Sequence, residues 1–161
     1  MRRALLICIA LGALVGPSAD AVPVRRVEAC HGLAVVLPHG WRLSHAHVTA
    51  TGCGPMQRLV AVSGEARLHP GMKVPSGVAI VLVLESWESP FAARPAHFAL
   101  GSLVRMGGCC EMPDGRGSEV LFRDHGRNFY AFVYATTAAQ RRAAVALLDS
   151  LRVNPEAVAG A

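Results

Sequence analysis

The chain lacks the short motifs that mark the most common enzyme classes. Its 161 residues contain no Gly-x-Ser-x-Gly nucleophile motif and no glycine-rich phosphate loop of the Walker or dinucleotide type. They contain no Cys-x-x-Cys pair either, so thioredoxin-like redox chemistry has no basis in the sequence. We therefore predict no catalytic residues and no cofactor, and an enzyme with an unrecognised site ranks only third among the functional hypotheses.

Lysine and runs of like charge are also scarce. Lysine occurs once, as Lys73, among 16 basic residues, and the formal net charge of +5 is spread along the chain. The excess of arginine, together with abundant Ala, Gly, Val and Pro, is typical of a GC-rich genome. A dispersed, mildly basic balance speaks against nucleic acid as a partner and favours weak attraction to acidic surfaces such as cell-envelope polymers.

Only the N-terminus carries a long apolar run. A basic start, Met1-Arg2-Arg3, precedes the apolar residues 4–15, and Gly16-Pro17 then ends any helix. Ala19-Asp20-Ala21 places small residues at the −3 and −1 positions of a cut, which completes the pattern of a secretory signal peptide over residues 1–21. We expect export to the periplasm, the cell envelope or the medium, with cleavage after Ala21. An uncleaved N-terminal membrane helix is the alternative.

Cleavage after residue 21 leaves 161 − 21 = 140 residues, the size of one domain with its own core. We predict a lead-in segment over residues 22–31, a single α+β domain over residues 32–155, and a disordered tail over residues 156–161. No apolar run after the signal peptide reaches the roughly 18 residues that a membrane span requires, so we expect no integral span in the mature chain.

Three segments carry clear secondary-structure signals. Residues 78–84 are seven consecutive apolar residues between turn signals, which predicts a strand covered on both faces in the middle of a sheet. Asp124-His125-Gly126 joins two alternating segments and predicts a β-hairpin. Residues 138–151 contain no Gly or Pro and repeat apolar residues at three-and-four spacing, which predicts an amphipathic helix capped by Thr136 or Thr137.

Four short motifs follow one another along the chain. They are Pro38-His39-Gly40-Trp41-Arg42, Arg94-Pro95-Ala96-His97-Phe98, Phe122-Arg123-Asp124-His125-Gly126-Arg127-Asn128-Phe129 and Leu147-Leu148-Asp149-Ser150-Leu151-Arg152. Over residues 32–153 this order resembles uncharacterised exported proteins of high-GC bacteria, and its first and last motifs resemble the PsbP-like fold. The resemblance implies an α+β fold, a mainly antiparallel β-sheet packed by a C-terminal helix in a PsbP-like sandwich. It implies no activity, because one fold hosts many functions.

The cysteines that remain after cleavage are candidates for disulfide bonding. They are Cys30, Cys53, Cys109 and Cys110, an even number in a chain with an oxidising destination. A bridge between the neighbours Cys109 and Cys110 demands strained geometry, so we predict a bond from Cys53 to one of them. Cys30 then pairs with the other or stays free.

Seven histidines raise the question of a metal site. His45 and His47 lie two residues apart, so on a strand both imidazoles share one face, an arrangement that can bind Zn²⁺ or Cu²⁺. His39 is close in sequence, and Cys30-His31 is a second thiol–imidazole pair. The alternative is that these are exposed polar side chains on an edge strand, since no third and fourth ligand stands at a recognised spacing.

Two further groups have a functional and a structural interpretation. Glu85 and Glu88 follow the apolar strand around Trp87 and could act as an acid–base pair, although such residues more often belong to a solvated loop. The aromatic residues of the hairpin fit core packing better than a carbohydrate platform.

The leading functional hypothesis is therefore an exported, non-catalytic module that binds a protein or cell-envelope component through its sheet face or loops. A metal-binding protein is the alternative.

Overall fold

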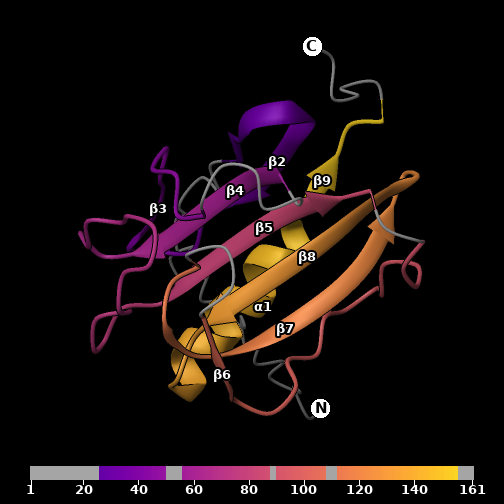
Figure 1. Cartoon of the computed structure of the whole chain (residues 1–161). Helices are drawn as coiled ribbons and strands as arrows, with labels where there is room; N and C mark the ends of the chain where they lie inside the picture. Colours follow the sequence, from indigo (N-terminus) through magenta and orange to yellow (C-terminus); the bar gives the residue numbers. More distant parts are fainter. Residues whose placement is uncertain (1–25, 50–55, 88–89, 108–111, 156–161) are drawn as a thin grey trace, which may run out of the picture.

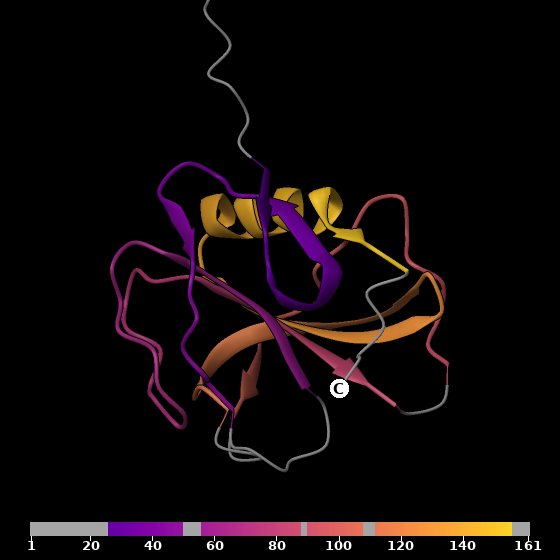
Figure 2. The ribbon, with the colours of Figure 1, turned by 90° about the horizontal axis from the view of Figure 1, so that it is seen from above.

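The computed structural model describes residues 26–49, 56–87, 90–107 and 112–155, and all structural statements concern these residues. They form an α+β fold in which a six-stranded antiparallel sheet carries one long helix on one of its faces (Figures 1 and 2). The elements in chain order are β1 (Arg26–Glu28), η1 (Cys30–Gly32), β2 (Leu33–Val36), β3 (Trp41–Leu43), β4 (Met56–Ser63), β5 (Ile80–Ser86), β6 (Val104–Met106), β7 (Gly115–Asp124), β8 (Arg127–Tyr134), α1 (Ala138–Ser150) and β9 (Arg152–Val153).

The large sheet has the strand order β3-β4-β5-β8-β7-β6, so β5 is an interior strand. Its residues Ile80 to Val83 are fully buried. Val81 and Val83 pack in the core under α1, whereas Ile80 and Leu82 pack in a second core on the opposite face. The unbroken apolar run therefore reflects burial on both faces of the sheet, and the predicted central strand is confirmed.

The predicted hairpin is β7–β8. Its two-residue loop, His125-Gly126, has positive φ angles of 48° and 79°, as a type I′ turn requires. Along β8, Phe129, Ala131 and Val133 face the helix-side core, and Tyr130, Phe132 and Tyr134 face the second core. The alternation of faces that the sequence predicts is confirmed.

Thr137, one of the two caps that the sequence predicts, caps helix α1 and forms a capping box with Gln140. Thr137 Oγ1 accepts a hydrogen bond from the Gln140 N–H, and the Gln140 side chain accepts from the Thr137 N–H. Ala144, Leu147 and Leu148 are completely buried against the sheet. These side chains share one stripe of the helix, so the stripe fixes which face of α1 packs on the sheet.

The C-terminal end of α1 is held by an arginine from a distant loop. Arg94 donates hydrogen bonds of 3.0, 2.9 and 2.6 Å to the carbonyl oxygens of Leu148, Asp149 and Leu151. The same guanidinium pairs with Asp124 at 2.9 Å. A cation at this end of a helix satisfies carbonyl groups that have no partner within the helix and complements the helix dipole.

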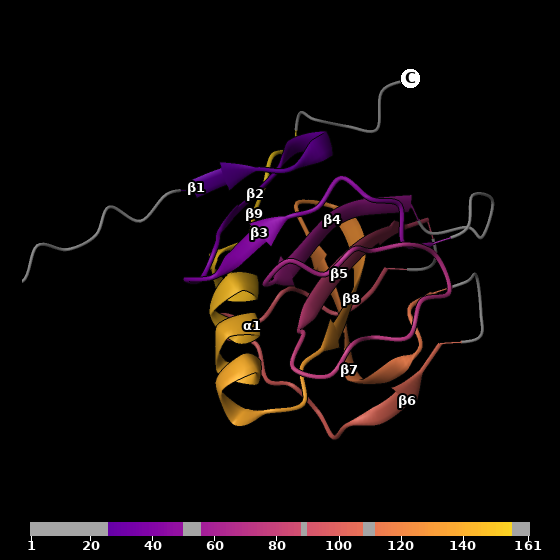
Figure 3. The same ribbon diagram turned by 90° about the vertical axis from the view of Figure 1, so that its left-hand side faces the viewer.

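A second, three-stranded sheet of order β1-β2-β9 lies at the C-terminal end of α1 (Figure 3). β1 pairs with β2, and η1 joins these two strands in the chain, so the region expected as a lead-in takes part in the fold from Arg26 onward. Asn154 N–H donates to Gly32 O at 2.8 Å, which joins the two ends of the domain. The strands of this sheet lie on both sides of the expected boundary at residue 32, and Leu33 of β2 pairs with Val153 of β9, 120 positions away in the chain.

The segment of residues 96–106 is ambiguous in sequence between a short helix and an edge strand. Within it β6 forms the outer strand of the large sheet, and the preceding residues run along α1 without regular structure. Among the described residues no helix is long and apolar enough to cross a membrane.

Candidate functional site

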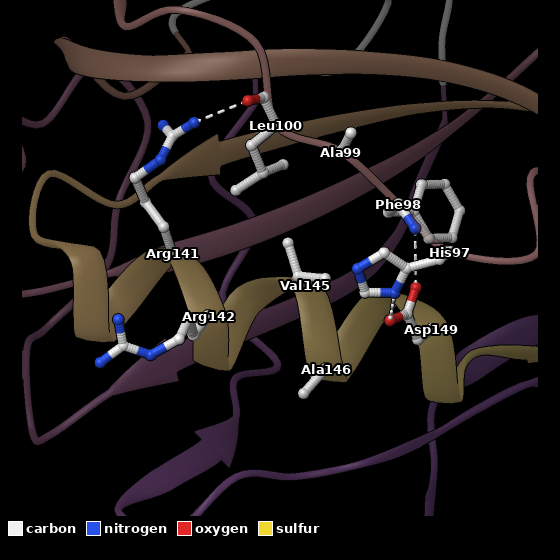
Figure 4. Close-up of a pocket in the computed structure, with 9 residues that line it drawn as sticks. All are labelled: His97, Phe98, Ala99, Leu100, Arg141, Arg142, Val145, Ala146 and Asp149. Carbon is white, nitrogen blue, oxygen red and sulfur yellow. Dashed lines mark hydrogen bonds and ion pairs between the residues drawn. The ribbon is translucent and has the colours of Figure 1, made fainter.

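A groove of about 530 Å³ lies between α1 and the segment of residues 97–100 (Figure 4). Its lining residues are His97, Phe98, Ala99, Leu100, Arg141, Arg142, Val145, Ala146 and Asp149. It exists because residues 97–100 run alongside the outer face of α1 while the buried stripe of the helix packs on the sheet.

One end of the groove is formed by a histidine–carboxylate pair. Asp149 Oδ1 accepts the Phe98 N–H at 2.8 Å, and Oδ2 lies 2.6 Å from His97 Nδ1. The carboxylate thereby fixes the imidazole and leaves its second nitrogen pointing away from Asp149 along the groove (Figure 4). With Nδ1 protonated toward the carboxylate, a neutral His97 presents Nε2 as an acceptor, and a protonated one presents a donor.

Two arginines stand at the other end of the groove. Arg141 donates to Leu100 O at 2.8 Å, Gly101 O at 2.7 Å and Ser118 Oγ at 3.1 Å, so it fastens the segment to the helix. Arg142 is exposed and makes no hydrogen bond or ion pair within the described part of the chain. Its charge is therefore available to a ligand.

The charge order along α1 runs against the helix dipole. Arginines occupy its N-terminal half and Asp149 its last turn, whereas the dipole favours acidic residues at the start and basic residues at the end. Arg141 and Asp149 have a structural explanation in their contacts with residues 97–101. Arg142 makes no such contact with the described residues.

The floor of the groove is apolar. Phe98 is 1% exposed and packs edge to face on Phe122, with ring centroids 5.1 Å apart. Leu100 and Val145 are half-buried beside it. An apolar floor between a cationic end and an imidazole suits a small amphipathic ligand with a carboxylate or similar anionic group. No serine, threonine or cysteine lines the groove among the described residues, so the His97–Asp149 pair has no nucleophile to activate there.

A smaller pocket of about 130 Å³ contains two of the histidines singled out in the sequence. His45 and His47 line it together with His31 and the guanidinium-bearing Arg58. His39 is exposed in the turn before β3 and does not line this pocket. Within the parts of the chain that are described, no group of three or more His, Cys, Asp or Glu residues is placed to hold a metal ion.

The expectation that His45 and His47 lie on a strand is wrong. β3 ends at Leu43, and residues 44–48 follow it without strand pairing. Gln57 holds this segment instead: its Oε1 accepts from the Val48 N–H at 2.9 Å and its Nε2 donates to Ala46 O at 2.8 Å. Hydrogen bonds from the Gln57 side chain thus replace the backbone pairing of a β-ladder here. A local strand pattern in the sequence gives no sign of such a contact.

Glu85 is an ion-paired residue of β5 rather than part of a solvated loop. Its carboxylate accepts from Arg58 Nε at 2.7 Å and from two nitrogens of Arg127, both at 2.7 Å. Burial raises the pKa of Glu85, but the hydrogen bonds and charges of Arg127 and Arg58 outweigh it and hold this pKa below its usual value. The suggested acid–base partner, Glu88, lies outside the described residues.

The predicted disulfide bond joins residues that the structure does not describe. Cys53, Cys109 and Cys110 lie outside the described residues, and only the backbone of Cys30, at the start of η1, is described. The predicted bond from Cys53 to Cys109 or Cys110 therefore stays a prediction.

The groove itself was not recognised in the sequence, although two of the four quoted motifs contain its residues. His97 belongs to Arg94-Pro95-Ala96-His97-Phe98, and Asp149 belongs to the C-terminal motif. Phe98 and Asp149 are 51 positions apart, so only the packing of α1 brings the two motifs together. Comparison of the chain with protein-family models, with curated proteins and with solved structures gives no match, and the functional argument therefore rests on the geometry of these sites.

Proposed function

We propose that the protein is an exported, non-catalytic binding module whose ligand is a carboxylate-bearing, partly apolar segment of a protein or cell-envelope component. The observation that carries this proposal is the groove beside α1. There the unpaired cation of Arg142 and the oriented imidazole of His97 flank an apolar floor.

The chemistry of the groove supports an anionic rather than a cationic ligand. An arginine presents several donors in a planar fork that matches a carboxylate, and Arg142 has no competing acceptor in the described part of the chain. Apolar ligand surface laid on Phe98, Leu100 and Val145 adds about 25 cal/mol per Å² removed from water. In this proposal the charge of Arg142 orients the ligand, and contact with the apolar floor of the groove adds to the binding free energy.

A binding role is favoured over catalysis by the exposure of the imidazole. The His97 side chain is 75% exposed, so solvent screens its partnership with Asp149. Catalytic groups are typically held in sites that exclude water, where electrostatic interactions are strong. A surface groove of this kind suits reversible recognition.

The direct test uses probes that differ only in charge. N-acetyl-Ala-Leu with a free carboxylate is titrated into the purified protein, expressed without residues 1–21, and compared with the same dipeptide as its amide. Binding is followed by ¹H–¹⁵N chemical shifts. We expect the carboxylate to shift the amide signals of residues 97–100 and 142–146 and the amide probe to bind at least about fivefold more weakly.

Variants locate the binding to the groove. Arg142→Gln should weaken carboxylate binding about tenfold, the effect of losing one charged contact. Ala146→Trp should block the groove, since Ala146 is exposed and its replacement leaves the core intact. Arg67→Gln, which removes an exposed arginine outside the groove, is the matched control. Equal binding by both probes, or equal loss in the control, contradicts the proposal.

Binding of Zn²⁺ or Cu²⁺ by His45 and His47 is the second candidate function. It is supported by the pocket that these two residues share with His31. The positively charged Arg58 in the same wall weighs against a cation. Calorimetric titration with zinc chloride decides: one equivalent bound by the parent and none by a His45→Gln/His47→Gln variant would establish the metal site.

Export and membership in a PsbP-like family remain part of the proposal. The composition of residues 1–21 supports export, and the α+β fold with its C-terminal helix is compatible with the resemblance. Fractionation of the native host, with N-terminal sequencing of the recovered protein, tests export independently of ligand binding.

A further inference from the structure

A buried charge cluster next to the histidine pocket has one positive charge too many. Arg58 and Arg127 have side chains 1% and 9% exposed, and both pair with the single carboxylate of Glu85, 14% exposed. Two guanidinium ions and one carboxylate leave an excess of +1. Because a charge removed from water is costly unless it is paired, this excess calls for an anion.

The donors of the two arginines show where the excess lies. Arg127 directs Nε and one terminal nitrogen at Glu85, and the other at His31 O, 3.0 Å away, and at Asn154 O, 3.5 Å away. Within the described residues Arg58 donates to one oxygen, Glu85 Oε2, and to the Met56 sulfur at 3.4 Å, a weak acceptor. Among the described residues, the guanidinium N–H groups left without a strong acceptor therefore belong to Arg58.

Arg58 lines the pocket of about 130 Å³ that also contains His31, His45 and His47. None of the described residues that line it is Asp or Glu, and the carboxylate of Glu85, which pairs with Arg58 Nε, is not among the lining residues. One water takes about 30 Å³ in the liquid, so the pocket has room for about four waters. That room suits a tetrahedral oxyanion and is too small for a nucleotide.

The electrostatics at His31 agree with an excess of positive charge. Burial is the main cause that lowers the pKa of His31, and the charge of Arg58, followed by that of Arg127, lowers it further against the opposing effect of Glu85. A cation in the pocket meets the same repulsion, and an anion is attracted.

We propose that this pocket is a binding site for a phosphate- or sulfate-type oxyanion, held by Arg58 with His31, His45 and His47 around it. The Ser44 hydroxyl, which accepts the Ala46 N–H at 3.2 Å, can donate its own hydrogen to the same ligand. The pocket shares no lining residue with the groove beside α1, so the two sites are independent.

The test titrates the protein lacking residues 1–21, kept in a chloride buffer, with inorganic phosphate, sodium sulfate, glycerol 3-phosphate and dimethyl phosphate. Binding is followed through the ¹⁵N signals of the histidine side chains. We expect saturable shifts of His31, His45 and His47, with His39 unaffected. Tighter binding of the inorganic ions assigns a free anion, and tighter binding of the esters assigns the phosphate group of a larger molecule. No saturation by any of the four probes overturns the proposal.

Three variants sharpen the test. His45→Gln/His47→Gln alters only exposed side chains and should raise the dissociation constant about tenfold, whereas His39→Gln should leave it unchanged. Glu85→Gln removes the competing carboxylate and should lower the dissociation constant about tenfold. Should Glu85→Gln fail to fold, the histidine variants still decide. Unchanged binding in the double variant, or zinc binding that phosphate does not compete with, contradicts an oxyanion site.

Discussion

Replacement of Glu85 by glutamine tests the central electrostatic feature of the fold. The substitution keeps the size of the side chain but removes the negative charge between Arg58 and Arg127. Three hydrogen bonds of 2.7 Å connect the carboxylate to these two guanidinium groups. A glutamine oxygen can keep some of them in weakened form, but its NH₂ group must then face an arginine donor.

The expected loss of stability follows from the burial of the partners. Removing one member of a buried ion pair typically costs about 3–5 kcal/mol, because the remaining charge is left without compensation. Glu85 keeps 14% of its side chain exposed, and some water can reach the cluster, so the lower end of that range applies. We expect the free energy of unfolding to fall by about 3 kcal/mol, a large share of ordinary domain stability.

The pH dependence gives an independent signature. The pKa of Glu85 in the folded state lies below its usual value of 4.5, so the folded state binds the carboxylate proton more weakly than the unfolded chain. The resulting stabilisation is fully present above pH 4.5 and is lost as the pH falls through the folded-state pKa. The stability difference between parent and Glu85→Gln should therefore shrink on acidification.

Urea unfolding at pH 7 and at pH values below 4.5, followed by far-UV circular dichroism and tryptophan fluorescence, measures both effects. Glu119→Gln is the matched control, because Glu119 is an exposed glutamate of β7 whose loss should change stability by less than about 0.5 kcal/mol. A loss below about 1 kcal/mol in Glu85→Gln, or a difference that does not shrink in acid, would refute this account of the charge cluster.

Three further predictions concern the helix, the N-terminus and the cysteines. Leu148→Ala should lower the free energy of unfolding by about 2–5 kcal/mol, since Leu148 is completely buried; a loss below about 1 kcal/mol in urea unfolding would contradict the packing of α1. N-terminal sequencing of exported protein should begin at Val22, and retention of Met1 in the membrane fraction would disprove cleavage. Non-reducing peptide mapping should join Cys53 to Cys109 or Cys110, and Cys53→Ser should then lower the melting temperature. If all mature thiols react with an alkylating reagent in unreduced protein, that bond does not form.

Local sequence patterns were sufficient for the elements whose neighbours follow closely in the chain. The hairpin of β7 and β8 depends on His125-Gly126 and on alternation within each strand, and helix α1 depends on Thr137 and one apolar stripe. The apolar run in β5 indicated burial on both faces without naming the strands that cover it. Each of these sequence patterns lies within a single helix, a single strand or a single tight turn.

The pairing of distant segments decided the rest. β1 and β9 were not expected because each is short and acquires its identity only by pairing with β2. Glu85 looked like a loop residue because its partners, Arg58 and Arg127, stand 27 and 42 positions away. His45 and His47 were expected on a strand, and the Gln57 side chain determined their actual place.

By itself the sequence determined the α+β class, the central strand, the hairpin and the C-terminal helix, because hydrophobic periodicity and turn chemistry act over a few residues. Only the tertiary structure decided that Arg142 and His97 flank one groove, and that Arg58, Glu85 and Arg127 form one cluster beside three histidines. Side chains far apart in the chain meet only after the elements have packed. A binding site made of such side chains leaves no local pattern in the sequence.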